Sequence, residues 1–506
     1  MKDTRLRDAL AGAISAGLAV GVTELVAGLV TSAPSLVESL GTWVIDHVPP
    51  ALKDWAIEVF GTNDKLALLV SITVVILIVG AVVGMFARTR FWLAVAVFSG
   101  FGVLAVLAAT ADPRISAIEA VVPALLGIVA GLATLRMLYR LGIAEPAAME
   151  GSRRAFILGA GAVVGVAVLS AGLGRTLLER AKRAIAGREE VVLPTASMPL
   201  APVPAAADFS IAGLTPIVVP NDDFYRIDTA LSVPNVNLEE WNLSFGGMVD
   251  SPYAIGLPEL LDMPMVERDV TLSCVSNRVG GGLVGNARWL GVPLGTLLDR
   301  AGVSADAEQV VGRSVDDFTV GFPLAAVFDG REAIVAVGMN GEPLPFEHGF
   351  PARLVVEGLY GYVSATKWLS AIELTTWDGF DAYWVPRGWS KEGPIKTQSR
   401  IDTPSDGARL TPGLVTVAGV AWAPNRGISR VEVQLGEDGD WVDAQLSEPL
   451  SDAAWVQWKV DWEPTSGRHL LTCRATDGDG EVQTSDVRPP APDGATGWHS
   501  LSVDVT

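Results

Sequence analysis

Five apolar segments in the first third of this 506-residue sequence decide what the chain can fold into. They cover about residues 9–31, 65–87, 91–110, 115–135 and 155–174. About 20 consecutive apolar residues cross a bilayer as an α-helix, so we expect residues 1–175 to form a transmembrane bundle of about five helices. The mean hydropathy of +0.36 beside a formal charge of −20 indicates two unlike parts, because no ordinary soluble domain combines these values.

Basic residues around these segments predict which side of the membrane each end occupies. They precede the first segment, separate the second from the third, and separate the fourth from the fifth: Lys2, Arg5, Arg7, Arg88, Arg90, Arg136, Arg140, Arg153 and Arg154. Such clusters stay in the cytoplasm, so we expect a multi-pass cell-membrane protein with an extracytoplasmic C-terminal body. The basic residues from Arg175 to Arg188 oppose this orientation, because they follow the fifth segment on the outer side.

The run Ser152–Leu158 holds paired arginines before an apolar stretch and resembles a twin-arginine export signal. That signal exports proteins already folded around a cofactor, which agrees with an outward-facing body. An ordinary basic flank of a membrane helix is the alternative interpretation.

The chain beyond the apolar segments divides into three parts by its turns and strands. Residues 176–222 are rich in Pro and Ala, and we expect a linker there. In residues 223–403 short apolar runs alternate with Gly and Pro turns, which predicts a mixed α+β domain with one sizeable core. Residues 404–506 show short strands at regular spacing between Gly- and Asp-rich turns, which predicts an immunoglobulin-like β-sandwich.

Cys274 is the most informative single residue of the body. It ends a short apolar run and precedes Asn277, Arg278 and three consecutive glycines, where the backbone can approach a ligand closely. A thiolate is a nucleophile or a soft metal ligand, and a single ligand implies a metal that brings its other donors with it. A buried structural cysteine is the alternative. The other cysteine, Cys473, lies about two hundred residues away, so we do not expect a disulfide.

Two clusters downstream carry side chains that bind anions. His348 and Arg353 belong to the first, and the guanidinium can grip a phosphate with two parallel hydrogen bonds. Ser364 and Lys367 belong to a glycine-containing loop that can cradle an anion. Each cluster alone fits a turn with surface charge, but together with Cys274 they describe a phosphorylated cofactor held between a thiolate and a basic end. The sequence has no zinc spacing, Walker loop, dinucleotide fingerprint or haem-attachment motif, so no haem is evident.

Five short motifs make the region from about residue 220 onward resemble the molybdopterin-binding oxidoreductases of the sulfite oxidase fold. The motifs are Asn221–Arg226, Thr271–Gly282, Asn340–Pro345, His348–Arg353 and Lys367–Leu369. The resemblance implies a molybdenum–molybdopterin cofactor. The expected β-sandwich is similar to the dimerisation domain of that family, which implies a homodimer. The apolar N-terminal segments fall outside the resemblance.

The resemblance also implies roles for individual residues. Cys274 would be the catalytic thiolate ligand of molybdenum, and Arg226 would be catalytic beside the anionic substrate position. The pterin phosphate would be held by His348, Arg353, Ser364 and Lys367. The remaining cofactor-binding residues would be Asn221, Phe224, Tyr225, Asn277 and Asp316.

Two positions depart from the pattern of the family. Val337 stands where sulfite oxidases have a tyrosine before the Met-Asn-Gly run, and Glu357 stands where the family usually has proline. Without that phenol the pocket loses a hydrogen-bond donor aimed at an oxyanion, which puts sulfite as the substrate in doubt. Sulfite oxidation and sulfoxide reduction both stay open.

These observations predict a membrane-anchored molybdenum oxidoreductase that transfers an oxygen atom to or from a small S- or N-oxide outside the membrane. Electrons would pass to another redox protein or to a membrane quinone, and we expect no nucleic-acid partner. Two other classes stay open. One is a cysteine hydrolase with Cys274 activated by His348, and the other is a non-catalytic scaffold that keeps the cofactor.

Overall fold

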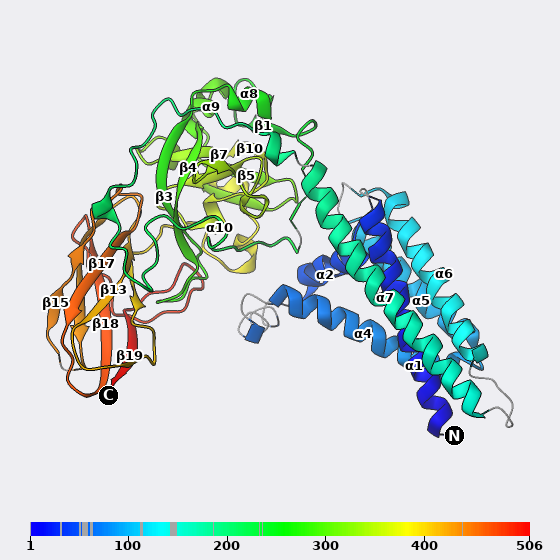
Figure 1. Cartoon of the computed structure of the whole chain (residues 1–506). Coiled ribbons are helices and arrows are strands. Elements are labelled where there is room, and N and C mark those ends of the chain that lie inside the picture. The colour runs from blue at the N-terminus through cyan, green and yellow to red at the C-terminus, as the bar shows by residue number, and fades with distance from the viewer. Residues whose placement is uncertain are drawn as a thin grey trace. The chain divides into compact units, whose positions relative to one another are not determined.

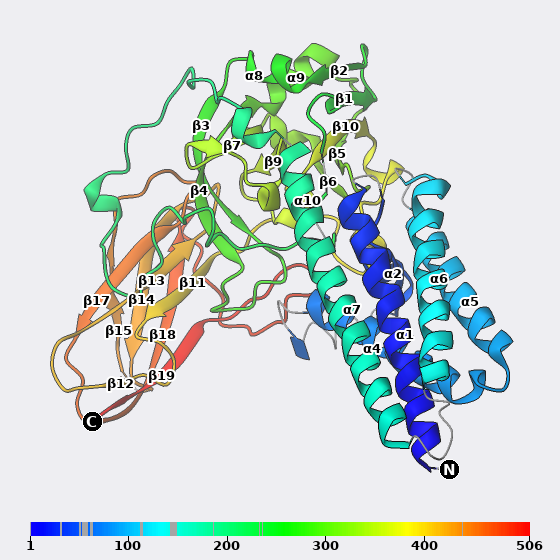
Figure 2. The same ribbon diagram turned by 45° about the vertical axis from the view of Figure 1, so that its right-hand side comes forward.

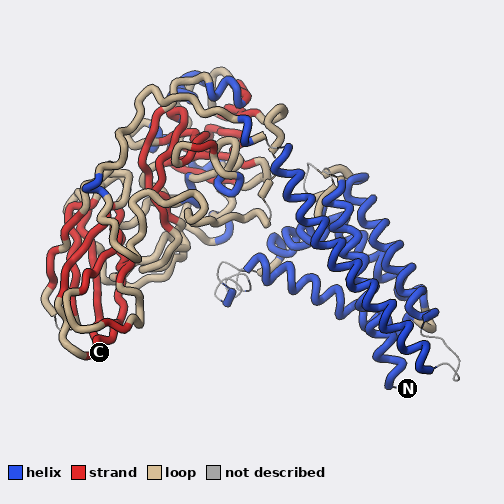
Figure 3. The backbone as a smooth tube through the Cα atoms, in the orientation of Figure 1, coloured by secondary structure: helices blue, strands red, loops and turns tan. Residues whose placement is uncertain are grey.

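The computed structural model describes residues 2–30, 33–49, 52, 59–60, 64–111, 115–141, 149–185, 187–231, 233–234, 236–437 and 439–506. The chain forms two compact units (Figure 1). The first unit comprises Met1–Ala186 with Ala230–Asn235, and the second comprises Gly187–Thr229 with Val236–Thr506. Helices make up the first unit, and strands dominate the second (Figure 3).

The predicted apolar segments are all helical. The helices of the first unit are α1 (Lys2–Leu29), α2 (Leu36–His47), α4 (Asp64–Ala87), α5 (Phe91–Ala109), α6 (Ala117–Leu141) and α7 (Met149–Ile185). Within the described residues, five stretches are long and apolar enough to cross a membrane: Thr4–Leu29, Lys65–Ala87, Phe91–Ala109, Ala117–Leu141 and Ile157–Leu177. The short helix α2 was not predicted; Ser35 caps it by accepting a hydrogen bond from the Glu38 amide.

Helix α7 extends beyond the predicted fifth segment at both ends. It includes Arg153 and Arg154, whose side chains lie outside the described residues. It also continues to Ile185, although a linker was expected from residue 176. No glycine or proline interrupts residues 175–185, and Gly187 beyond them has a φ of +57°, a conformation that no α-helix continues through.

Helix α1 packs backbone to backbone against two neighbouring helices through glycines. A Cβ atom added to Gly12 would lie 2.0 Å from the carbonyl oxygen of Gly80 on α4. One added to Gly28 would lie 2.1 Å from the carbonyl oxygen of Gly174 on α7. Such distances leave no room for any side chain, so these glycines set how closely the helices approach.

Two sheets form the first part of the second unit. One has the order β2-β1-β10-β5-β6, and the other has the order β3-β4-β7-β8 with β9 paired to β7 (Figure 2). The strands are β1 (Asn242–Gly247), β2 (Tyr253–Gly256), β3 (Val266–Ser273), β4 (Val284–Pro293), β5 (Gln309–Ser314), β6 (Thr319–Pro323), β7 (Ala333–Met339), β8 (Glu342–Pro343), β9 (Arg353–Val356) and β10 (Leu369–Thr375). Short helices α8 (Leu257–Leu261), α9 (Leu294–Ala301) and α10 (Gly361–Ser364) connect them. This mixture confirms the predicted α+β pattern.

Two further sheets form the C-terminal part, with the orders β11-β13-β17-β16 and β12-β19-β18-β14-β15. Their strands are β11 (Gln398–Thr403), β12 (Arg409–Leu410), β13 (Val415–Trp422), β14 (Ile428–Leu435), β15 (Trp441–Asp443), β16 (Gln445–Leu446), β17 (Val456–Trp462), β18 (Gly467–Asp477) and β19 (His499–Val505). Both sheets line one buried core that includes Val417, Val433, Trp458 and Leu471. We call this part the two-sheet domain.

The two-sheet domain begins earlier than the sequence indicated. Strand β11 ends at Thr403 and was assigned to the preceding domain, but it pairs antiparallel with β13. Val482 forms only a single bridge, with Thr476, and belongs to no strand. The closing strand β19 was not predicted.

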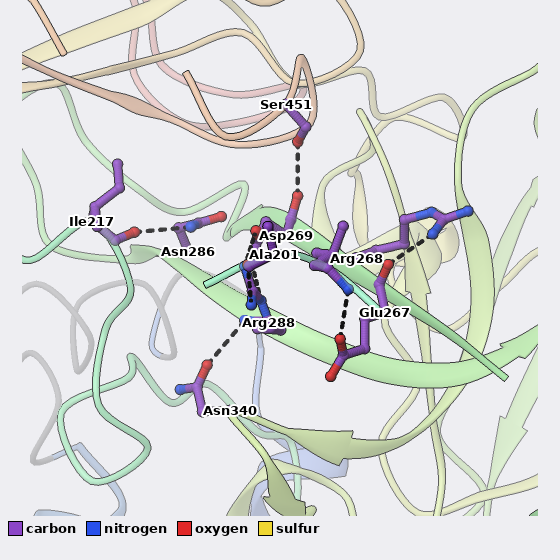
Figure 4. Close-up of polar contacts among 10 residues, drawn as sticks. Ala201, Ile217, Glu267, Arg268, Asp269, Asn286, Arg288, Asn340 and Ser451 are labelled. Atoms are coloured by element: carbon purple, nitrogen blue, oxygen red, sulfur yellow. Dashed lines mark hydrogen bonds and ion pairs between the residues drawn. The ribbon is translucent and has the colours of Figure 1, made fainter. Parts of the chain in front are cut away.

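Residues 191–222 run alongside strands β3 and β4 without forming a strand of their own. Asn286 on β4 donates a side-chain hydrogen bond to the Ile217 carbonyl oxygen at 2.8 Å (Figure 4). Next to it, Arg288 pairs with Asp269 on β3 through contacts of 3.0 and 2.8 Å (Figure 4). These contacts fix the path by which the chain reaches the first residues of the pocket.

Candidate functional site

A pocket in the second unit gathers side chains from distant parts of the chain. The hollow between them spans about 920 Å³, a volume that includes space open to solvent. It is lined by Phe224, Tyr225, Ile227, Asp228, Thr229, Cys274, Val275, Ser276, Ser314, Asp316, Phe318, His348, Arg353, Gly361, Tyr362, Ala365, Lys367, Trp368, Trp384 and Trp389.

Cys274 lies directly after β3, at the neck of a loop that folds back on itself. Its backbone amide donates to the Leu283 carbonyl oxygen at 2.9 Å, and its own carbonyl oxygen accepts from the Asn277 amide at 3.0 Å. The thiol is free and buried. Burial raises the pKa of the Cys274 thiol, and hydrogen bonds from Ser276 oppose that rise. A thiolate at this position would need a further stabilising charge, such as that of a metal ion.

The described residues contain no group of three or more His, Cys, Asp or Glu side chains arranged to hold a metal ion. As a metal ligand, Cys274 would therefore be a single donor beside those of a bound molecule. A thiolate suits a soft metal that arrives with sulfur donors of its own. The donor set thus fits the molybdenum of a molybdopterin cofactor.

Arg353 places a positive charge inside the protein without an ion-pair partner among the described residues. Its side chain is 5% exposed and lies over the ring of Trp289. Its Nη1 donates to the His348 carbonyl oxygen at 3.1 Å, but no carboxylate of the described residues pairs with it. Burial lowers the pKa of Arg353 to about 10. Since a buried charge is costly unless it is paired, this guanidinium fits an anionic ligand such as the phosphate of a pterin.

Lys367 is the second buried cation, and it has a partner that the sequence did not reveal. Its ammonium group forms an ion pair with Asp228, which also accepts from Arg226 Nε at 2.5 Å. Burial opposes ionisation of Asp228, but the charges of Lys367 and Arg226 hold the pKa of this carboxyl below its usual range. Lys367 Nζ also donates to the Glu347 carbonyl oxygen at 3.0 Å.

His348 is a neutral hydrogen-bond donor. Burial, with the neighbouring charges of Arg353 and Lys367, lowers the pKa of His348 to about 4. Its Nε2 lies 3.0 Å from the Asn221 carbonyl oxygen, so this nitrogen carries the proton. The ring also meets Phe224 edge-on at 5.5 Å. His348 therefore ties the Asn221 segment to the cationic end of the pocket.

Four of the predicted site residues do not line the pocket and instead brace its walls. They are Asn221, Arg226, Asn277 and Ser364. The side-chain oxygen of Asn277 accepts from the Leu283 amide at 2.9 Å, which holds the Cys274 loop. The Ser364 hydroxyl donates to the Tyr360 carbonyl oxygen at 3.1 Å.

Asn340 explains how Asn221 is held. Its Nδ2 donates to Asn221 Oδ1 at 2.8 Å. Its Oδ1 accepts from the Arg288 backbone amide at 2.9 Å (Figure 4). Asn340 has a φ of +52°, a left-handed conformation that asparagine tolerates better than most residues. The Asn340–Pro345 motif thus shapes the pocket from outside.

Aromatic rings form another wall, which the sequence reasoning missed. Trp384 lies 5.2 Å from Tyr383 and 6.2 Å from Trp389, and Trp389 lies 5.9 Å from Tyr362. Phe318 continues the series at 5.5 Å from Tyr383. These rings come from segments up to about 70 residues apart, so no local pattern announces them.

The fold and this pocket define an oxidoreductase domain that binds molybdopterin. Residues 230–384 match the family described as the oxidoreductase molybdopterin binding domain. Human mitochondrial sulfite oxidase is 29% identical over 320 residues, which cover 54% of this chain and 58% of that protein. The Bacillus subtilis (strain 168) protein named uncharacterized oxidoreductase YuiH is 32% identical over 157 residues, which cover 31% of this chain and 76% of that protein.

A solved structure shows the same fold. The sulfane dehydrogenase SoxCD from Paracoccus pantotrophus superimposes with a TM-score of 0.50 at 24% identity, covering 57% of this chain and 81% of that chain. The chain belongs to the sulfite oxidase family of molybdopterin oxidoreductases, and the predicted family is confirmed.

Proposed function

We propose that the second unit binds a molybdenum–molybdopterin cofactor and transfers an oxygen atom to or from a small organic S- or N-oxide. The observation that carries this proposal is that one free thiol and one buried guanidinium without an ion-pair partner in the described residues line the same pocket. Cys274 supplies a single soft ligand, and Arg353 supplies a buried charge without a carboxylate partner in the described part of the chain. A metal cofactor with an anionic tail satisfies both.

The residues of the pocket divide the work of holding the cofactor. Arg353 and Lys367 would bind the phosphate, with His348 fixing the adjacent backbone, and Cys274 would bind the metal. Phe224, Tyr225 and Asp316 would line the cofactor, braced by Asn221, Asn277 and Ser364 behind them. When bound, the cofactor supplies a metal that exchanges two electrons together with an oxygen atom.

The lining of the pocket favours an organic substrate over sulfite. Val337, where sulfite oxidases have a tyrosine, is buried within β7 and offers no hydrogen bond to an oxyanion. Arg226, expected to orient an anion, does not line the pocket, and its guanidinium is paired with the lining residue Asp228. The ring series from Phe318 to Tyr362 instead offers apolar faces that suit an organic group.

The five apolar helices support an anchor in the cell membrane, with the second unit on its outer face. Electrons would pass to a separate redox protein or to a membrane quinone. The two-sheet domain supports an immunoglobulin-like fold and pairing into a homodimer. The alternative of a cysteine hydrolase gains no support, because no hydrogen bond joins Cys274 to His348 in the described residues.

The test compares metal, pterin and turnover in the full-length protein made with ample molybdate. We expect about one molybdenum per chain in the wild type and in Cys473→Ser, a control that changes the other buried cysteine. Cys274→Ser should lose turnover of S- and N-oxides by at least about a hundredfold, because the metal loses its protein ligand. Arg353→Met should lose bound pterin, because the phosphate loses its buried counter-ion.

Equal turnover in Cys274→Ser and wild type would remove Cys274 from its role. Retention of the cofactor without turnover on any S- or N-oxide would leave the scaffold interpretation standing. Oxidation of sulfite faster than reduction of any organic oxide would overturn the choice of substrate.

A further inference from the structure

Two side chains of the two-sheet domain contact the far end of the loop that follows Cys274. Arg400 on β11 donates from Nη1 to the Gly281 carbonyl oxygen at 2.8 Å. His499, the first residue of β19, lies against Gly280, where an added Cβ would come within 2.2 Å of the imidazole ring. Because β11 and β19 belong to different sheets, both sheets of that domain reach this loop.

Arg400 is itself held rigidly. Its Nε donates to Asp402 Oδ1 at 2.6 Å, and its Nη2 donates to Thr215 Oγ1 at 2.9 Å. With the bond to Gly281, each of its three guanidinium nitrogens has a partner, and its side chain is buried. A planar guanidinium fixed at three points cannot follow a moving loop, so it defines where Gly281 lies.

His499 is fixed in a comparable way. Its Nδ1 accepts a hydrogen bond from the Ile401 backbone amide at 3.0 Å, which sets the orientation of the ring. Gly280 has a φ of +75° and lies directly against that ring, so both its backbone conformation and its neighbour exclude a side chain. The contact is therefore one of shape, and it complements the hydrogen bond from Arg400.

Hydrogen bonds within the loop connect these two contacts to the backbone of Cys274. Its neck is closed by the bond from the Cys274 amide to the Leu283 carbonyl oxygen at 2.9 Å. Inside the loop, Asn277 Oδ1 accepts from the Leu283 amide at 2.9 Å. Few residues separate the gripped glycines from the neck, so a shift at Gly281 moves the backbone that carries the thiol.

We propose that Arg400 and His499 are positioning residues that hold the thiolate of Cys274 at its bonding position on the metal. The two-sheet domain then serves the metal site directly, in addition to any part it plays in dimerisation. This inference rests on the proposed function in one respect, namely that Cys274 is the metal ligand.

The test uses the full-length, cofactor-loaded protein and the variant Arg400→Gln. Hydrogen–deuterium exchange of the peptide that spans residues 275–283 should accelerate at least tenfold. The electron paramagnetic resonance signal of the half-reduced metal should shift or broaden, because that signal reports the bonding of the thiolate. We expect kcat to fall about tenfold while KM changes less than twofold, since the substrate wall is not touched. His499→Ala should change the same quantities in the same direction.

Matched variants separate positioning from general damage. Arg430→Gln removes an exposed arginine of the same domain on β14 and should leave the loop exchange and the metal signal unchanged. Thr215→Val removes only the support of Arg400 Nη2 and should give an intermediate acceleration, even if Arg400→Gln proves unstable.

If hydrogen–deuterium exchange of residues 275–283 is unchanged in both Arg400→Gln and Thr215→Val, Arg400 does not hold the loop in place. Faster exchange with an unaltered metal signal would overturn the positioning of the thiolate while leaving the contact in place. Wild-type protein without molybdenum would instead refute the proposed function, and the exchange measurement would still report whether the grip exists.

Discussion

The two units of this chain pack by opposite means. In the helical unit the closest contacts join backbone to backbone, with Gly12 against Gly80 and Gly28 against Gly174. In the second unit the largest fully buried side chains are tryptophans, including Trp289, Trp422, Trp455 and Trp458. Glycines, which have no side chain, bring the helices of the first unit together, whereas large side chains fill the core of the second unit.

The difference agrees with the proposal that the first unit lies in a membrane and the second in water. Helices surrounded by lipid gain little from burying apolar groups against each other, so close van der Waals contact between small residues drives their association. A domain in water is stabilised mainly by the apolar area it buries, at roughly 25 cal/mol per Å². Substitutions that shrink or enlarge a residue should therefore harm the two units unequally.

The largest expected effect is the loss of a large side chain in the two-sheet domain. Leu471 is fully buried between its sheets, and Leu471→Ala should lower the free energy of unfolding by about 2–5 kcal/mol. Leu414→Ala is the matched control, because Leu414 is 67% exposed and should change the value by less than about 0.5 kcal/mol. Urea unfolding followed by tryptophan fluorescence measures both. Equal losses in the two variants would contradict the packing described for this core.

The reverse change should harm the helical unit. Gly12→Leu forces a side chain into the carbonyl oxygen of Gly80, 2.0 Å from the new Cβ, and should cost about 3 kcal/mol. Gly100→Leu on α5 is the control, since a Cβ there meets nothing within 4 Å. Thermal unfolding of the detergent-solubilised chain compares them. If Gly12→Leu is as stable as Gly100→Leu, glycine contacts do not hold these helices together.

A smaller loss of stability is expected when a buried carboxylate of the two-sheet domain loses its charge. Asp477 in the two-sheet domain accepts hydrogen bonds from Arg426 Nε at 2.9 Å and Thr397 Oγ1 at 2.8 Å. Burial opposes its ionisation, but these bonds hold the pKa of Asp477 below the usual 3.8. Asp477→Asn should therefore lower the free energy of unfolding by about 1.5 kcal/mol at pH 7.

The sign of the pH dependence follows from the direction of that shift. A carboxyl with a lowered folded-state pKa stabilises the fold fully above pH 3.8, and this stabilisation disappears as the pH falls through the folded-state pKa. The difference between wild type and Asp477→Asn should shrink below pH 3.8 in the same urea titrations. A difference that stays constant down to pH 2 would show that the charge of Asp477 contributes nothing.

The sequence predicted the elements whose pattern is local. The apolar helices were evident because about 20 apolar residues in succession have few other solutions. The end of α7 was missed because residues 175–185 are basic and polar, so the apolar pattern stops while the helix continues. Strand β11 was misplaced because pairing with β13 depends on residues that follow it in the chain.

The site residues also differ in whether a local sequence pattern could predict them. Cys274, His348, Arg353 and Lys367 could be found because each stands in a short motif, and all four line the pocket. Asp228 could not be found, since its partner Lys367 lies 139 residues away and only the fold brings them together. The contacts of Asn221 and Asn277 could not be predicted for the same reason, because they join parts of the fold next to the pocket: Asn221 contacts Met339 and Asn340, and Asn277 contacts Leu283.

No carboxylate of the described residues pairs with the buried guanidinium of Arg353, and under the proposed function this has a consequence for the protein without its cofactor. A chain that folds with an empty pocket keeps a positive charge in its interior at a cost of several kcal/mol, comparable to the whole stability of many domains. If the proposed cofactor binds there, its anionic tail would remove that cost, and the cofactor would stabilise the fold as well as supply the chemistry. Chains without the cofactor should unfold more often and be degraded by proteases sooner than chains that carry it.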